Sequence, residues 1–287
     1  MDSVRIAVIG GTGLYKIEGI EIKDELDIVT PFGKPSDKIT VASIDGVNVA
    51  FLPRHGFGHR FLPTEIPVKA NIWALKKIGV ERIIAVSAVG SLKEEIRPRD
   101  IVIPDQIIDR TKSRANSFFG DGIVGHVAFA DPYCNDLRAI LLDTVKELGY
   151  KVHFGGTYIC MEGPLFSTRA ESNLYRSWGG SVIGMTALPE AKLAREAEIC
   201  YGMLAFSTDY DCWKEGEEDV SIEMVVENLK ANTSAAQEII KKVVKTIPEK
   251  RTCICKDAAK YAIITDPAAI PKETKNKLDL FYGKYWN

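Results

Sequence analysis

Short apolar runs bounded by glycine or proline alternate along this chain with longer segments in which apolar residues recur at helical spacing. A continuous apolar run is typical of a strand buried on both faces, whereas the helical spacing predicts an amphipathic helix. The predicted strands are residues 4–9, 39–44, 47–52, 82–86, 101–104, 151–160, 181–185 and 201–207. The predicted helices begin near residues 64, 136, 168, 189 and 221 and end near 79, 149, 178, 200 and 246. This alternation predicts an α/β fold, and a single domain is the default for 287 residues of which 46% are hydrophobic.

The stretch 181–213 predicts a strand, a helix and a second strand that ends in two aspartates one residue apart. Met185 and Thr186 follow the first strand, and Asp209 and Asp211 follow the second. A right-handed crossover would join the two strands in parallel, so both would deliver polar groups to the sheet edge at which ligands bind. Aspartates that merely cap a turn are the alternative for an isolated Asp-x-Asp, so the assignment depends on the other segments.

A glycine-rich turn follows the first predicted strand. Its residues are Gly10, Gly11, Thr12 and Gly13, and glycines let backbone N–H groups approach an anion while a threonine hydroxyl adds a donor. A dinucleotide fingerprint would need a third glycine at the position of Lys16. A phosphate-binding turn and a purely structural turn therefore both fit.

Two other strand ends carry groups suited to an anion. Arg54 and His55 follow the strand 47–52, and a guanidinium offers a planar fork to phosphate oxygens, although a surface loop is an equal alternative. His55 and His59 are separated by glycines and lack the glutamate of a zinc helix, so no zinc pair is predicted there. Ser87 and Ala88 end the strand 82–86 and suit either close approach to a ligand or simple tight packing.

Local signals predict where several elements begin and end. Asp45-Gly46 predicts a two-residue hairpin, Thr64 and Gly79 bracket a helix, and Thr168 with Glu171 forms a capping box. Residues 105–134 lack periodicity, which in a compact domain indicates a functional or interfacial segment. This segment contains His126.

The charge balance and the start of the sequence restrict the kind of partner and the cellular location that we expect. The 37 basic and 39 acidic residues give a net charge of -2, which argues against a nucleic-acid partner and favours a small-molecule ligand. The sequence opens directly on a strand, with no signal sequence and no long apolar run. We therefore expect a cytoplasmic protein without membrane contact.

The six cysteines show no CxxC pair of the kind that binds zinc. Buried free thiols explain most of them, but Cys253 and Cys255 form a CxC in a polar tail, where burial is a poor explanation. A redox or structural disulfide is expected there, and a cytosolic structural disulfide would indicate a thermophilic source.

Eight segments in this order resemble one family closely: GGTGL, PFGKPSD, RHG, NIWAL, VSAVGSLKEEIRPRDIVIPDQIIDRT, EGPLFSTRAES, GMTALPEA and TDYDCWKE. They resemble the 5′-methylthioadenosine phosphorylases, which belong to the trimeric branch of the purine nucleoside phosphorylases. The resemblance covers residues 4 to about 230. It implies a phosphorylase-type α/β domain over residues 1–250, with a mixed, partly barrel-like sheet flanked by helices, and a C-terminal extension, 251–287, packed on the domain or at a subunit interface. It also implies a homotrimer, or a homohexamer made of two trimers.

The resemblance assigns site residues position by position. The phosphate-binding positions are Gly11, Thr12, Arg54, His55, Ser87, Ala88 and Thr186, with Ser87 standing where relatives often have threonine. The nucleoside-binding positions are Phe166, Ser167, Met185, Asp209, Asp211, Ile222, Val225 and Val226, with His126 reaching the 5′ side from a neighbouring subunit. Separately from the resemblance, we hypothesise two disulfides, Cys134 with Cys200 and Cys253 with Cys255.

The implied reaction is phosphorolysis of S-methyl-5′-thioadenosine to adenine and 5-methylthioribose 1-phosphate, a step of purine and methionine salvage. Asp209 and Asp211 would be catalytic, because a protonated Asp209 can donate to the departing purine. Inorganic phosphate is a co-substrate, and no metal or organic cofactor is expected. A broader purine nucleoside phosphorylase acting on adenosine, inosine or guanosine is the close alternative. A nucleotide-dependent oxidoreductase and a non-catalytic nucleoside sensor are the alternatives from other classes.

Overall fold

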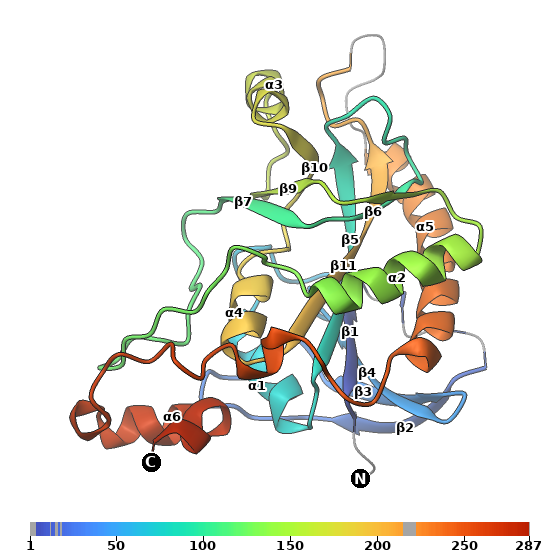
Figure 1. Cartoon of the computed structure of the whole chain (residues 1–287). Helices are drawn as coiled ribbons and strands as arrows, with labels where there is room; N and C mark the ends of the chain where they lie inside the picture. Colours follow the sequence, from blue (N-terminus) through green and yellow to red (C-terminus); the bar gives the residue numbers. More distant parts are fainter. Residues whose placement is uncertain (1–3, 12, 15–16, 18, 215–221, 287) are drawn as a thin grey trace.

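The computed structural model describes residues 4–11, 13–14, 17, 19–214 and 222–286, with the side chains of 222–227 left undescribed. An 11-stranded mixed sheet forms the centre of this part of the chain, and helices cover it (Figure 1). The α/β class and the mixed sheet flanked by helices, both expected from the sequence, are confirmed.

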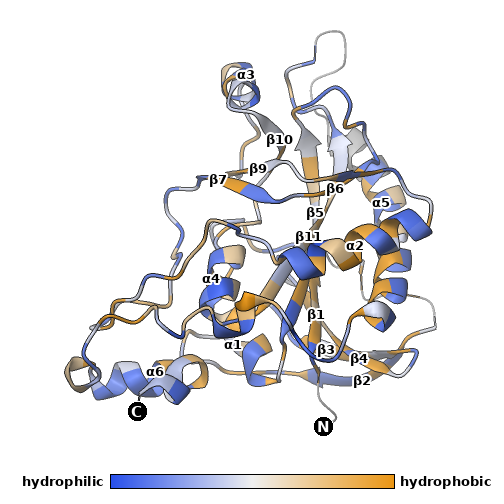
Figure 2. Ribbon diagram, viewed as in Figure 1, coloured by the Kyte–Doolittle hydropathy of each residue, from blue (hydrophilic) through white to orange (hydrophobic). Residues whose placement is uncertain are grey.

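Three long buried strands form the middle of the sheet, namely β1 (Ile6–Gly10), β5 (Arg82–Ser91) and β11 (Cys200–Asp209). β5 pairs in parallel with β1 on one side and with β11 on the other. Every residue of β1 and β11 is buried, which explains why these strands have continuous apolar runs in the sequence. Figure 2 shows this hydrophobic concentration in the central strands.

One edge of the sheet is an antiparallel hairpin beside β1. The strands β3 (Ile39–Ile44) and β4 (Val47–Pro53) turn through Asp45 and Gly46, which both have positive φ, so the predicted two-residue turn is confirmed. The outermost strand, β2 (Glu21–Leu26), was not predicted. Its sequence EIKDEL has no buried side, and such a polar edge strand leaves almost no hydrophobic pattern.

The other end of the sheet consists of shorter strands that extend it past β5 and β11. The sheet runs from β5 through β10 and β9 to β7, while β6 joins β11 to β8. These strands are β6 (Ile101–Ile103), β7 (Gln106–Arg110), β8 (Val152–Phe154), β9 (Thr157–Met161) and β10 (Gly180–Gly184).

Two hydrophobic cores lie on opposite faces of the central strands. In β1, Ala7 and Ile9 contribute to one core while Ile6 and Val8 contribute to the other, as the two-residue period of a strand requires. The first core lies under α1 (Val68–Lys77), α4 (Glu190–Glu196) and α6 (Lys272–Tyr282), and the second under α2 (Asn135–Glu147) and α5 (Ile222–Thr246). The remaining helix, α3 (Arg169–Ser177), packs against β10 and starts with the predicted capping box between Thr168 and Glu171.

Four details of the sequence prediction are wrong. The strands before and after α4 do not run in parallel, because β10 is antiparallel to β5 whereas β11 is parallel to it. The predicted strand 151–160 is split into β8 and β9 by Gly155 and Gly156, both at positive φ. The helix predicted from Thr64 starts at Val68, where Pro67 is the N-cap residue. Residues 105–134 contain the strand β7.

The C-terminal segment folds back onto the rest of the chain. After two short turns of 3₁₀ helix, η1 (Ile254–Asp257) and η2 (Pro267–Ala269), it ends in α6 and a last such turn, η3 (Gly283–Tyr285). Leu278, Phe281 and Tyr282 of α6 are buried in the core that also contains α1. The first residues of the segment 251–287 lie beside β11 and α2. Its last residues lie beside α1.

Neither expected disulfide is present. None of the six cysteines forms a disulfide, and Cys200 Sγ lies 3.2 Å from Cys253 Sγ, a pairing that differs from both expected ones. The inference of a thermophilic source, which depended on those disulfides, gains no support. Within the described ranges, no helix combines the length and the apolar content that a membrane span requires.

Candidate active site

The candidate residues meet at the carboxyl half of β5. β10 pairs with this half in the antiparallel direction through Ile183 and Gly90, and Asp209 of β11 pairs with Gly90 from the other side. The chain that leaves β10 therefore runs back along β5, which places the Thr186 hydroxyl 2.9 Å from the Ser87 hydroxyl. The antiparallel strand β10, and not the expected shared edge of parallel strands, brings these two hydroxyls together.

Asp209 is a buried carboxyl group held at both oxygens. Its side chain is about 7% exposed, Oδ1 accepts a hydrogen bond from the Asp211 backbone N–H at 2.8 Å, and Oδ2 lies 2.6 Å from the Thr208 hydroxyl. Burial raises the pKa of Asp209, and the nearby charge of Asp211 acts in the same direction. Asp209 is therefore more often protonated than an exposed aspartate at the same pH.

Thr208 can support Asp209 in either protonation state, a role that the sequence did not reveal. Its hydroxyl lies 2.6 Å from Asp209 Oδ2 and 3.2 Å from the carbonyl oxygen of Val89. It can donate to the carboxylate when Asp209 is ionised, and donate to the carbonyl while accepting from the carboxyl when Asp209 is protonated. Thr208 is thus a positioning residue for the proton on Asp209.

Asp211 is brought beside Asp209 by a local turn. It has a positive φ of 51° and is about 9% exposed. Burial also raises the pKa of Asp211. Two neighbouring carboxyl groups with raised pKa values are a frequent feature of sites that perform acid or base catalysis.

Gly90 lies so close to the aspartates that a side chain would crowd them. A Cβ at this position would lie 3.0 Å from Asp209 Oδ1, 3.1 Å from Ile183 Cγ2 and 3.3 Å from Asp211 Cβ. The sequence prediction missed this role, because a glycine inside a strand does not reveal which side chains face it.

Replacing Gly90 with alanine should therefore displace the Asp209 carboxyl group. We expect kcat/KM to fall roughly 10- to 100-fold, since small misplacements of a reacting group are costly. Gly202→Ala is the matched control: it adds a methyl group to the opposite end of β11, where the nearest atoms belong to Leu137 at 2.9 Å. Both variants should lose some stability, but only Gly90→Ala should lose activity, and a Gly90→Ala enzyme with kcat/KM within twofold of wild type would contradict this role.

Arg54 is buried and is held by Glu190. Its Nε and Nη2 donate to the two oxygens of Glu190, both at 2.9 Å, and its remaining bonds go to the carbonyls of Val86 and Ile9. Burial disfavours the charged guanidinium, but the charge and hydrogen bonds of Glu190 outweigh it and raise the pKa of Arg54. Four of its five N–H groups are therefore engaged, so the fork expected to face phosphate faces Glu190. Among the residues that the structure describes, one N–H of Nη1 has no partner and could bind a ligand.

Glu190 is the third residue that sequence reasoning missed. It lies at the start of α4, is about 1% exposed, and also accepts a hydrogen bond from the Tyr201 hydroxyl at 2.8 Å. The sequence places an acidic residue in the first helical turn, which usually indicates only a favourable interaction with the helix dipole. Its actual partner, Arg54, follows β4, and only the folded structure brings the end of β4 next to α4.

His55 is neutral in this arrangement. Its Nδ1 lies 2.8 Å from the Phe61 carbonyl oxygen, and its ring stacks on His59 at 4.1 Å between centroids. Burial, above all, lowers the pKa of His55 to about 4. Because a carbonyl can only accept, Nδ1 carries the proton, and Nε2 is left as a hydrogen-bond acceptor rather than a positive charge.

The loop after β9 lies over Met185. A Cβ at Gly163 would be 2.6 Å from Met185 Sδ, so the loop backbone and this side chain are in close contact. Farther along, the Ser167 carbonyl lies 3.2 Å from Cys212 Sγ, directly after the aspartates, while Phe166 is about 55% exposed. Arg114 anchors this region, since its guanidinium donates to the carbonyls of Glu162 and Leu188, each at 2.6 Å.

Several predicted residues are not brought into this arrangement by the described chain. Thr12 lies outside the described residues, as do the side chains of Ile222, Val225 and Val226. Gly11, directly after β1, and Ala88, in the carboxyl half of the neighbouring β5, are exposed. His126 is exposed on a loop. Its own backbone N–H donates to the carbonyl of Ala262, in the segment that leads to α6, at 2.8 Å.

Comparison with known proteins identifies the family of this chain. Residues 5–245 match the family model described as the phosphorylase superfamily. The S-methyl-5′-thioadenosine phosphorylase of Geobacter sulfurreducens is 60% identical over 98% of both chains. The chain belongs to this phosphorylase family. A second member, the S-methyl-5′-thioadenosine phosphorylase of Koribacter versatilis, is 52% identical over 98% of this chain and 96% of its own.

Solved structures of phosphorylases have the same fold. A methylthioadenosine phosphorylase from an antarctic soil metagenomic library superposes with a TM-score of 0.94 at 47% identity, covering 98% of this chain and 99% of its own. A mutant adenosine/methylthioadenosine phosphorylase from Schistosoma mansoni in complex with methylthioadenosine gives a TM-score of 0.83 at 34% identity, covering 90% and 96%. The superfamily model ends at residue 245, but the family relatives also cover the C-terminal segment.

Proposed function

We propose that this chain catalyses the phosphorolysis of S-methyl-5′-thioadenosine to adenine and 5-methylthioribose 1-phosphate, as a pentosyltransferase. The observation that carries the proposal is the position of Asp209, a buried carboxyl group with a raised pKa whose strand partner on β5 leads directly to Ser87 and Thr186. The relative from Geobacter sulfurreducens carries this activity in its name.

Asp209 stabilises the negative charge that develops on the leaving purine. When the bond between N9 and C1′ breaks, its electron pair moves into the purine ring, and the Asp209 proton is transferred or hydrogen-bonded to N7. The Thr208 hydroxyl and the Asp211 N–H hold the carboxyl group before and after this step. Asp211 raises the proton affinity of Asp209 and lines the base position from the other side.

Phosphate attacks the opposite face of the sugar. One of its oxygens forms the new bond to C1′ as positive charge develops on the ribosyl group. Its other oxygens meet the hydroxyls of Ser87 and Thr186, the free N–H of Arg54 and the backbone near Gly11 and Ala88, with Thr12 as a further donor. Because His55 is neutral, its Nε2 can accept a hydrogen bond from the P–O–H group of phosphate. Positioning of this kind can contribute roughly 7–11 kcal/mol toward the barrier.

The 5′ side of the substrate meets aliphatic residues and a neighbouring subunit. Ile222, Val225 and Val226 favour a methylthio group over a hydroxyl, a preference worth about 1–3 kcal/mol for one such group. His126 reaches the same pocket from the adjacent chain of a homotrimer or homohexamer, while Phe166, Ser167 and Met185 enclose the purine and ribose. A preference of this size permits slow phosphorolysis of adenosine. Activity on adenosine is part of the alternative function, a broader purine nucleoside phosphorylase.

The pH dependence should reveal the Asp209 proton. Since burial raises the pKa of Asp209 and the protonated form is the donor, kcat/KM should fall as pH rises through that pKa. Asp209→Asn should lack this alkaline limb, whereas the ionisation of phosphate affects both enzymes equally. His55, with a pKa of about 4, should add no ionisation between pH 5 and 9. An alkaline limb of the same shape in both enzymes would contradict the role of Asp209.

Initial rates on four nucleosides test the substrate. We expect S-methyl-5′-thioadenosine to be cleaved fastest, adenosine more slowly, and inosine and guanosine least, each only when phosphate is present. Equal rates on inosine and S-methyl-5′-thioadenosine would favour the broader purine nucleoside phosphorylase.

A further inference from the structure

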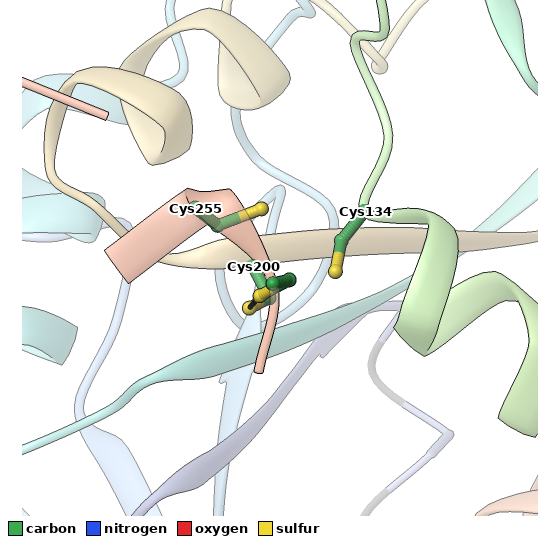
Figure 3. A group of neighbouring side chains, drawn as sticks. Cys134, Cys200 and Cys255 are labelled. Carbon is green, nitrogen blue, oxygen red and sulfur yellow. Dashed lines mark hydrogen bonds between the residues drawn. The ribbon is translucent and has the colours of Figure 1, made fainter. Parts of the chain in front are cut away.

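Four cysteines from separate parts of the chain meet in one cluster. Cys134 is the N-cap residue of α2, Cys200 is the first residue of β11, and Cys253 and Cys255 are at the start of η1. Their four sulfur atoms all lie within 4.8 Å of one another. Figure 3 shows Cys134, Cys200 and Cys255 gathered from these three elements.

The spacing of the sulfurs fits a tetrahedral metal ion. Zinc bound to four thiolates at about 2.3 Å has sulfurs roughly 3.8 Å apart, a value bracketed here by the 3.2 Å between Cys200 and Cys253 and by the upper limit of 4.8 Å. A disulfide would need one pair at about 2.05 Å, and all four thiols are free. The arrangement therefore has the shape of a ligand shell and not of two bridges.

The surroundings favour a closed structural site. The second core buries Cys134, Cys200 and Cys255. Cys253 is partly exposed, so an ion can reach the cluster from solvent at this residue. Four sulfur ligands select a soft tetrahedral ion and disfavour magnesium or calcium, which require oxygen. The N-terminus of α2 adds a favourable interaction with the negative charge of a thiolate at Cys134.

We propose that Cys134, Cys200, Cys253 and Cys255 bind one structural Zn²⁺. Each thiol releases its proton to solvent, so the four thiolates and the ion carry a net charge of -2, and nothing is oxidised or reduced. Cys200 and Asp209 are at opposite ends of β11, about 30 Å apart for an extended strand, so this ion takes no part in the chemistry. Its role is to hold the start of the C-terminal segment against β11 and α2.

The metal content of the full-length, tag-free enzyme tests the proposal directly. The protein would be grown with added zinc salt, purified without chelator or thiol reagent, and analysed by inductively coupled plasma mass spectrometry. We expect one zinc per chain in the wild type, less than about a tenth of that in Cys253→Ser, and full occupancy in Cys160→Ala, which removes a buried thiol outside the cluster. Cys253 is chosen because its partial exposure makes the serine variant easier to accommodate.

A second measurement separates a structural ion from a merely adventitious one. Removal of zinc by a chelator should lower the thermal midpoint by several degrees, and added zinc should restore it, without a change in the KM for the nucleoside. Metal-free wild-type protein would overturn the proposal, whether intact mass shows the loss of two hydrogens per disulfide or four free thiols. Iron in place of zinc, or a midpoint that is identical with and without zinc, would also overturn it.

Discussion

Replacing Asp209 with asparagine should lower kcat for S-methyl-5′-thioadenosine by a factor of about 10²–10⁴, which is the usual contribution of a positioned general acid. An amide has nearly the same shape: its oxygen can accept from the Asp211 N–H, and its NH₂ can donate to the Thr208 hydroxyl, which in turn donates to the Val89 carbonyl. It cannot release a proton to N7. The loss should therefore appear in kcat, with the fold and the thermal midpoint little changed.

The same variant should shift the choice of purine. A carboxyl group can accept a hydrogen bond from the 6-amino group of adenine, whereas the amide NH₂ can donate to the oxygen of a 6-oxopurine. We expect the rate on inosine or guanosine, relative to S-methyl-5′-thioadenosine, to rise in Asp209→Asn. Asp24→Asn, an exposed change on β2, serves as the control. An unchanged preference in Asp209→Asn would refute the assignment of the base-recognition residue.

Replacing Glu190 with glutamine should destabilise the protein by roughly 3–5 kcal/mol, because it leaves the buried Arg54 guanidinium without its counter-charge. For a chain of this size, we expect the thermal midpoint to fall by roughly 5–15 °C. Arg54 would also lose one of the two bonds that fix its orientation, because the NH₂ of glutamine cannot accept from the guanidinium. The KM for phosphate should then rise more than the KM for the nucleoside.

Glu249→Gln is the matched control for this change. Glu249 pairs with Arg5 at 3.0 Å, but its side chain is 84% exposed. Removal of an exposed pair of this kind usually costs about 1 kcal/mol or less. If both variants unfolded at the same denaturant concentration, or if Glu190→Gln raised only the nucleoside KM, the role given to Glu190 would be wrong.

The central strands could be predicted because they are buried on both faces. Burial leaves an uninterrupted apolar run in β1 and β11, and the turn at Asp45-Gly46 has a local signature that needs no tertiary information. The direction of β10 could not be predicted in the same way. A parallel strand and an antiparallel strand can have the same apolar run in the sequence. The direction of such a strand is set by the strands with which it pairs in the folded protein.

The candidate site was predictable to a similar extent. Polar residues at strand ends indicated Asp209 and Thr186 and allowed an anion site at Arg54 and Ser87, and the family resemblance supplied the remaining nucleoside-binding positions. Glu190, Thr208 and Gly90 were missed because their importance depends on contacts between elements distant in sequence. The four cysteines were missed as a cluster for the same reason, since a search for paired CxxC spacing looks only along the chain.

The measurement that tests the central claim most directly follows labelled phosphate through one reaction. The enzyme would be incubated with S-methyl-5′-thioadenosine and [³²P]phosphate, and adenine and labelled sugar phosphate would be quantified from the same samples. The account predicts that the two appear in equal amounts and that no adenine forms without phosphate. Adenine released with the label still in inorganic phosphate, or released equally well without phosphate, would contradict it.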